Sequence, residues 1–164
     1  MVEVGTLYQV GDKIVHPMHG AGVIDAIVKK KMNGVTRDYY TMKLPAGSMM
    51  VLIPTDHSDE IGVRPVVDAE KADEIIDSMR DIDVDMTQNW NHRYRENMVR
   101  LKSGNLTEVA RVVKGLMLRE GDRGLSTGER KMLHSAKQIL ISELVLSKDS
   151  SYEAMEACID RAMS

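Results

Sequence analysis

Residues 88–95 contain the side chains whose types and spacing most clearly suggest a chemistry. The segment holds Trp90, the only tryptophan of the chain, and Arg93, Tyr94 and Arg95 follow shortly after it. Basic residues interleaved with aromatic rings suit a polyanion whose bases can be stacked on or wedged apart. The segment therefore predicts contact with a nucleic acid.

A second interpretation of Trp90 is that it anchors a small helical core, with the neighbouring arginines on the solvated face. Spacing alone favours this interpretation, because a lone tryptophan in a small domain usually packs inside. Two details favour the first one. Trp90 stands near the start of a helical pattern and not within its apolar stripe, and its neighbours Asn89 and Asn91 are polar. The residues themselves leave both interpretations open.

The formal charge reverses sharply at this segment. Residues 67–87 contain eight acidic and two basic side chains, net −6, whereas residues 88–137 contain eleven basic and five acidic ones, net +6. The whole chain carries only −3. Basic side chains on at least three predicted helices of this block are Arg93, Arg95, Arg111, Lys114, Arg119, Arg130 and Lys131. On one shared surface they would bind phosphates with a steep salt dependence, through shape and backbone more than through sequence.

Residue types that support catalysis or metal binding are present but poorly arranged. His16 and His19 lack the further ligands of a closed zinc site. The run Asp56-His57-Ser58 is adjacent only in sequence, whereas a catalytic triad is a constellation in space. The acidic run over 81–85 lacks the glycine and the distal glutamate of a calcium loop. We therefore expect no catalytic residue, metal, cofactor or small-molecule substrate.

Length and composition are those of an ordinary globular protein. With 164 residues, the chain can form one medium domain or two small ones. It has 13 Met and no Phe, so its cores should be aliphatic and rich in thioethers. The single cysteine, Cys158, fits a reducing compartment and is interpreted as a buried small hydrophobe. No leader segment or membrane-length apolar run is evident, so we expect a cytoplasmic protein without membrane contact.

The elements that must position these residues fall into two groups. From Tyr8 to Val66 the pattern is that of short strands. They are predicted over 13–16, 23–28, 37–44 and 49–54, with glycine breaks at 20–22, an Asn33-Gly34 hairpin and a turn over 45–48. Residues 1–7 are expected to be a loose lead-in. Short strands joined by tight turns indicate a small, strongly bent sheet or barrel.

After Pro65 the apolar period changes from two to 3.6 and predicts about five helices. Asp68 caps the first, a second covers 90–102, and Asn105 caps a third that ends near Gly121. Capping boxes, Ser126 with Glu129 and Ser150 with Glu153, open the last two. The predicted class is therefore α+β, with a β domain over 1–66 and an all-α domain over 67–164.

The predicted β domain carries two features that could bind a partner. Lys29, Lys30 and Lys31 close one strand, which is typical of a solvated hairpin end that discourages pairing between sheet edges. They could alternatively form a polar contact surface. Met50 and Leu52 alternate with apolar neighbours, so one face of their strand could be covered by a partner that adds a strand to the edge.

These residues resemble a known family. The segment Val10-Gly11-Asp12-Lys13-Ile14-Val15-His16-Pro17-Met18-His19-Gly20 is similar to the V-G-D-x-V-V-Y-P-x-H-G opening of CarD-like bacterial transcription regulators. Further similarity lies in Ile53-Pro54, Gly62-Val63-Arg64, residues 89–95, Ser103-Gly104 and residues 123–133. The resemblance runs from about Tyr8 to Ala162, with both halves in the family's order.

The resemblance implies a fold and a function. In this family a Tudor-like or SH3-like barrel binds the RNA polymerase β subunit, and the helical domain contacts promoter DNA at the upstream edge of the bubble. A family tryptophan inserts at the minor groove as a wedge, which corresponds to Trp90. Family phosphate contacts match Arg93, Arg95 and Arg130. With the other basic residues of the block, the expected DNA-binding set is Trp90, Arg93, Arg95, Lys114, Arg119, Arg130 and Lys131.

The expected polymerase-binding set is Lys30, Met32, Met50 and Leu52. Some family members have an arginine where this chain has Leu52. The leucine removes one charge-assisted contact, while Lys30 keeps a charge nearby. The expected function is stabilisation of the open promoter complex by a cytoplasmic, nucleoid-associated protein. The alternative is an adaptor that docks on polymerase without productive DNA contact, and a nucleic-acid-processing enzyme is a distant third.

Overall fold

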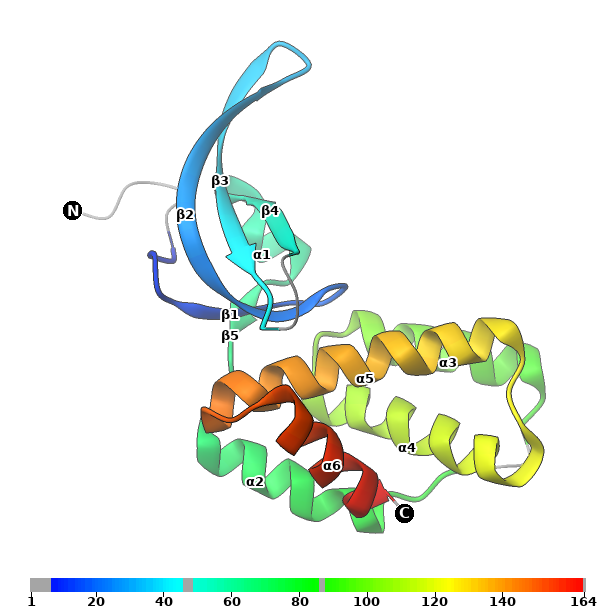
Figure 1. Ribbon diagram of the computed structural model, residues 1–164. Coiled ribbons are helices and arrows are strands. Elements are labelled where there is room, and N and C mark those ends of the chain that lie inside the picture. Colours follow the sequence, from blue (N-terminus) through cyan, green and yellow to red (C-terminus); the bar gives the residue numbers. More distant parts are fainter. Residues whose placement is uncertain (1–6, 46–48, 86–87, 164) are drawn as a thin grey trace.

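The computed structural model describes residues 7–45, 49–85 and 88–163 and has a β half followed by a helical half (Figure 1). The strands are β1 Lys13–His16, β2 Gly20–Met32, β3 Val35–Lys43, β4 Met50–Pro54 and β5 Arg64–Pro65. The α-helices are α1 Ser58–Ile61, α2 Ala69–Ser78, α3 Trp90–Lys102, α4 Leu106–Arg123, α5 Thr127–Lys148 and α6 Tyr152–Met163, with 3-10 turns η1 Thr55–His57 and η2 Met79–Asp81. The predicted α+β class, with a Tudor-like sheet domain before five helices, is confirmed.

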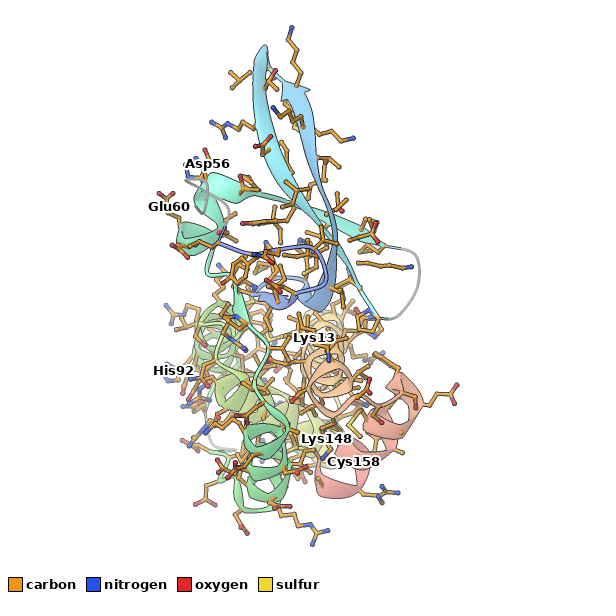
Figure 2. The ribbon with its side chains drawn as sticks, turned by 90° about the vertical axis from the view of Figure 1, so that its left-hand side faces the viewer. Lys13, Asp56, Glu60, His92, Lys148 and Cys158 are labelled. Carbon is orange, nitrogen blue, oxygen red and sulfur yellow. The ribbon has the colours of Figure 1, made fainter. Side chains whose placement is uncertain are left out.

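The sheet is antiparallel with the strand order β4-β3-β2-β1-β5. Its longest element is the β2–β3 hairpin, which projects away from the helical half (Figure 2). Asn33 and Gly34, at φ 51° and 78°, form the predicted hairpin turn, because two positive φ values match the twist of the flanking strands. Buried side chains, including Ile14, Tyr40 and Ile53, form the hydrophobic core of the sheet domain.

The predicted break at residues 20–22 is wrong. These residues belong to β2 and pair with β1, with His16 opposite Gly20 and Ile14 opposite Gly22. A Cβ on Gly22 would lie 2.6 Å from the side chain of Met42 and from the carbonyl oxygen of Lys43. Gly22 is needed because β2 and β3 approach each other closely at this point, and not because the chain turns there.

Side-chain caps begin the helices largely as predicted. Asp68 accepts the Lys71 N–H at 2.8 Å, and Ser126 accepts the Glu129 N–H at 3.2 Å. The cap of α6 is corrected by one residue, because Ser151 and not Ser150 accepts the Ala154 N–H. Ser150 instead donates its N–H to the Val145 carbonyl and completes the end of α5.

The remaining predictions for loops fall partly outside the described residues, namely most of the lead-in over 1–7 and of the turn over 45–48. Cys158 is half-buried against the helical core, as a small apolar residue would be. No helix in the described ranges is long and apolar enough to cross a membrane.

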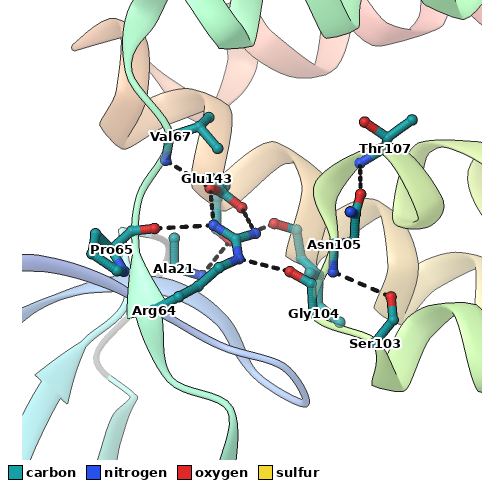
Figure 3. Close-up of polar contacts among 11 residues, drawn as sticks. Ala21, Arg64, Pro65, Val67, Ser103, Gly104, Asn105, Thr107 and Glu143 are labelled. Atoms are coloured by element: carbon teal, nitrogen blue, oxygen red, sulfur yellow. Dashed lines mark hydrogen bonds and ion pairs between the residues drawn. The ribbon is translucent and has the colours of Figure 1, made fainter. Parts of the chain in front are cut away.

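Helix α5 joins the two halves because it packs against both β2 and the other helices. The Arg64 guanidinium donates to both carboxylate oxygens of Glu143 at 2.7 Å, and its Nε donates to the Gly104 carbonyl at 2.7 Å (Figure 3). Glu143 is fully buried and also accepts the Val67 N–H at 3.0 Å. This bidentate pair links β5, α5 and the loop before α4.

A second set of contacts fixes the start of β2 on the same helix. The Ala21 N–H donates to Ser142 Oγ at 2.9 Å, and Lys13, at the junction in Figure 2, donates from Nζ to the Leu146 carbonyl at 3.0 Å. A Cβ on Gly20 would lie 2.6 Å from Ser142 Oγ. The backbone at the start of β2 therefore lies directly against α5.

Candidate nucleic-acid interface

Trp90 is an exposed side chain at the first turn of α3. Asn89 caps the helix by accepting the His92 N–H at 2.9 Å, which fixes where the helix starts. The indole is 44% exposed and lies outside both hydrophobic cores. The interpretation of Trp90 as a core anchor is therefore wrong.

Neighbouring side chains hold the exposed indole. Its ring stacks on Tyr94, one helical turn away, with ring centroids 5.0 Å apart and ring planes at 19°. Its Nε1–H donates to Ser126 Oγ at 3.2 Å. An open depression of about 330 Å³ beside it is lined by Trp90, Asn91, Tyr94 and Arg95. Trp90 is thus a presented aromatic surface with a defined orientation.

Arg93 is largely buried and paired, in contrast to its expected role as a phosphate contact. Its Nε donates to Glu129 Oε2 at 2.8 Å and its Nη2 to Oε1 at 3.1 Å, while Nη1 donates to the Gln88 carbonyl at 3.1 Å. The side chains of Arg93 and Glu129 are only 11% and 2% exposed. All three nitrogens of this guanidinium are already engaged, so Arg93 links α3 to α5.

The electrostatics of Glu129 reflect this pairing. Burial raises its pKa, but the hydrogen bonds and charge of Arg93, the charge of Arg119 and a hydrogen bond from the Ser126 backbone together outweigh burial. The pKa of Glu129 therefore lies below its ordinary value, and the carboxylate is ionised at neutral pH.

Three predicted basic residues are exposed on the two helices whose starts meet at the indole. Arg95 is on α3, one turn from Asn91, and Arg130 and Lys131 are on the first turns of α5. The Trp90–Ser126 hydrogen bond brings the starts of these two helices together. Of these cations, Arg95 lines the depression beside the indole, whereas Arg130 Nη2 donates to the Leu125 carbonyl at 3.3 Å and Lys131 lines a separate depression with Tyr94.

Lys114 and Arg119 are placed differently. Lys114 is only 6% exposed, so it does not offer a free surface cation. Its position four residues after the buried Ala110 was a signal of this, because the two share a helix face. Arg119 is partly buried in a cavity of about 450 Å³ whose lining mixes arginines with acids such as Asp83 and Glu96. The structure therefore does not bring these two into the exposed basic surface.

The four residues expected to bind polymerase share one face of the sheet. The register places Lys30 opposite Arg37, Met32 opposite Val35, Leu52 opposite Thr41 and Met50 opposite Lys43. These β3 partners are all odd-numbered, so their side chains project from the same side. Lys30, Met32, Met50 and Leu52 are all exposed, whereas Val51 and Ile53 between them are buried.

This outer face is long and ends at an unpaired edge. The two extreme rows, at Val35 and Lys43, are eight positions apart on β3, which corresponds to about 27 Å of strand. Tyr39 lies between them and donates a hydrogen bond to Met32 Sδ at 3.7 Å. β4 stands at the end of the strand order, so in the described part of the chain its outer edge pairs with no further strand.

Among the described residues, the candidate catalytic and metal-binding motifs do not come together as a site. Within the described ranges, no group of three or more His, Cys, Asp or Glu side chains could hold a metal ion. His16 and His19 face each other, with ring centroids 4.7 Å apart, and burial followed by the charge of His19 lowers the pKa of His16. Ser58 bonds to the Thr55 carbonyl, whereas His57 approaches Asp56 and Glu60.

Comparison with known proteins decides the family. The CarD-like/TRCF RID domain model matches residues 8–67, and the CarD C-terminal domain model matches residues 74–160. The chain is a member of the CarD-like family. This CarD-like protein is 37% identical over 142 residues to the "Putative transcription factor YdeB" of Bacillus subtilis (strain 168), covering 87% of this chain and 93% of that protein. These matches identify a family of transcription factors.

Proposed function

We propose that this CarD-like protein binds the β subunit of RNA polymerase through the outer face of its sheet and stabilises the open promoter complex with its helical half. Trp90 would insert at the minor groove at the upstream edge of the bubble. The observation that carries this proposal is the exposed, oriented indole beside Arg95, at the point where two helices with exposed cations meet. The RID match and the family assignment support the polymerase contact.

The wedge mechanism follows from stacking energetics. Opening one base step costs a few kcal/mol, and an aromatic ring that fills the opened step slows its closure. Trp90 is suited to this because Tyr94 already supports one side of it. Exposed Arg95, Arg130 and Lys131 would bind the adjoining phosphates without reading sequence.

Attachment to polymerase lets weak DNA contacts suffice. A tethered contact experiences an effective concentration set by geometry, which reaches about the millimolar range for short connections. The outer face offers exposed Met32, Met50 and Leu52 for an apolar contact, Lys30 for a charged one, and the free edge of β4 for strand addition.

The test of the DNA contact is the lifetime of open complexes formed by cognate polymerase, with the wild type and with Trp90→Ala. We expect the wild type to lengthen the lifetime and the variant not to. Because the indole is 44% exposed, the variant should lose less stability than the roughly 3–5 kcal/mol of a buried tryptophan. Equal lifetimes would favour the adaptor, in which polymerase docking alone acts.

The test of the polymerase contact is binding of the isolated β subunit by Leu52→Asp. A buried carboxylate in the contact should abolish binding while the fold persists, because Leu52 is exposed in the free protein. Val99→Asp is the matched control, since Val99 is also apolar and is a more exposed residue, on α3. Loss of binding in both variants would contradict a contact through the sheet.

A further inference from the structure

We infer that Tyr94, Ser126, Glu129 and Arg93 form an indole socket that fixes the orientation of Trp90, so that Arg93 and Ser126 are positioning residues and not DNA contacts. This inference rests on the proposed function, which supplies the role of Trp90. It also separates Arg93 from the phosphate-contact role that family resemblance implies.

Ser126 is the centre of the indole socket. A serine hydroxyl has two acceptor lone pairs and one donor hydrogen. Ser126 Oγ accepts the Trp90 Nε1–H at 3.2 Å and the Glu129 backbone N–H at 3.2 Å, and it lies 3.4 Å from Glu129 Oε1, toward which it can donate. The cap of α5 is therefore also the hydrogen-bond partner of the indole, and its full bonding capacity is in use.

Glu129 extends the indole socket from the hydroxyl to α3. Its carboxylate is held by the Nε and Nη2 atoms of Arg93, at 2.8 and 3.1 Å. Arg93 lies one helical turn beyond Trp90 on α3. The indole is thus connected to α5 in two ways. Its own N–H bonds to Ser126, and Arg93, on the helix that carries the indole, bonds to Glu129.

Tyr94 restricts the ring plane. It stacks on the indole at a centroid distance of 5.0 Å and packs against α5 at Gly128, where a Cβ would stand 3.7 Å from Tyr94 Cε2. One indole face is therefore covered, and the hydrogen bond sets the rotation within the stack. A side chain held in this way loses less conformational entropy when it enters a base step, which favours insertion.

The first measurement is the fluorescence anisotropy decay of the free, full-length protein, in which Trp90 is the only indole. Ser126→Ala should increase the local mobility of the ring. Ser126→Thr, which keeps the hydroxyl, should restore the wild-type decay. Ser151→Ala is the matched control, because it removes a helix cap of the same kind from α6 without touching Trp90.

The second measurement is the open-complex lifetime with the same variants. Loss of one neutral hydrogen bond should shorten the lifetime about two- to tenfold in Ser126→Ala and leave Ser151→Ala at the wild-type value. Trp90→Phe removes the N–H but keeps a ring. In that background, Ser126→Ala should therefore cause no further shortening.

The outcomes separate the indole socket from the proposed function. Unchanged ring mobility in Ser126→Ala would overturn the socket, whatever the lifetimes. If Trp90→Ala shortens the lifetime but Ser126→Ala does not, the positioning role is wrong and the wedge stands. If Trp90→Ala itself has no effect, the proposed function fails, and the positioning role fails with it.

Discussion

At the scale of single residues, arginines from one short segment have different roles. Arg93 and Arg95 are two positions apart, yet one is buried against Glu129 and the other is exposed beside Trp90. Neighbouring positions on a helix point in different directions, so sequence proximity does not imply a shared function. Charge type alone therefore overestimates the number of exposed cations that could contact phosphates.

Salt dependence should distinguish the two kinds of arginine. We expect Arg95→Gln and Arg130→Gln each to reduce the slope of log K against log salt for promoter DNA by about 1, because each removes one of the proposed phosphate contacts. Arg93→Gln should leave the slope unchanged but lower the free energy of unfolding by about 3–5 kcal/mol, because it leaves Glu129 buried without its partner. A slope reduced equally by Arg93→Gln would contradict its assignment to the indole socket.

How far individual residues could be predicted depended on their surroundings. The sequence indicated that Trp90 begins a helix, but its exposure depends on how α5 lies beside α3, which no local pattern encodes. Ser126 was predictable as a cap and not as an indole partner, because the two residues are far apart in sequence. Lys114 was placed in the DNA-binding set by its charge, although its helix face argued for burial.

At the scale of elements, the α3–α5 pair depends on one ionised carboxylate. The folded-state pKa of Glu129 is depressed, so its ionisation stabilises the fold fully above the unfolded glutamate pKa of about 4.3. That contribution is lost as the pH falls through the lowered folded pKa, because the unfolded state then binds the proton more readily.

We therefore expect the free energy of unfolding to decrease more steeply with falling pH below about 4.3 in the wild type than in Glu129→Gln. Urea denaturation at a series of pH values measures both slopes, and the other acidic residues contribute equally to each protein. Parallel curves would show that Glu129 does not have a depressed pKa. The variant itself should be less stable at neutral pH, since Arg93 loses its anionic partner.

Elements were predictable wherever their signals were local. The Asn33-Gly34 turn and the caps Asp68, Asn105 and Ser126 were correct because turns and caps are decided within a few residues. The glycines at 20–22 misled because a tight turn and a close strand contact both require the absence of a side chain. Only the positions of α5 beside Gly20 and of β3 beside Gly22 reveal the close contacts.

At the scale of the whole molecule, the fully buried Glu143 joins the two halves. Arg64→Met should lower the free energy of unfolding by about 3–5 kcal/mol, because it leaves this carboxylate without a cation. Glu143→Gln should cost less, about 1–3 kcal/mol, because no charge stays buried and Arg64 can reach solvent. Chemical denaturation measures the free energy of unfolding of both variants. Equal decreases would contradict the idea that an unpaired buried charge is the main cost.

The consequence of this junction is a fixed reach. Helix α5 is hydrogen-bonded to β2 and close to β5. The distance from the outer sheet face to Trp90 is therefore set by these contacts and not by a flexible linker. Each base pair advances the duplex by about 3.4 Å. If Trp90 inserts as proposed while the sheet is bound to polymerase, a promoter whose bubble opens one base step further along would present the indole with a different step and a rotated groove. The protein would then discriminate between promoters by the position of the melted region relative to polymerase, and not by base sequence.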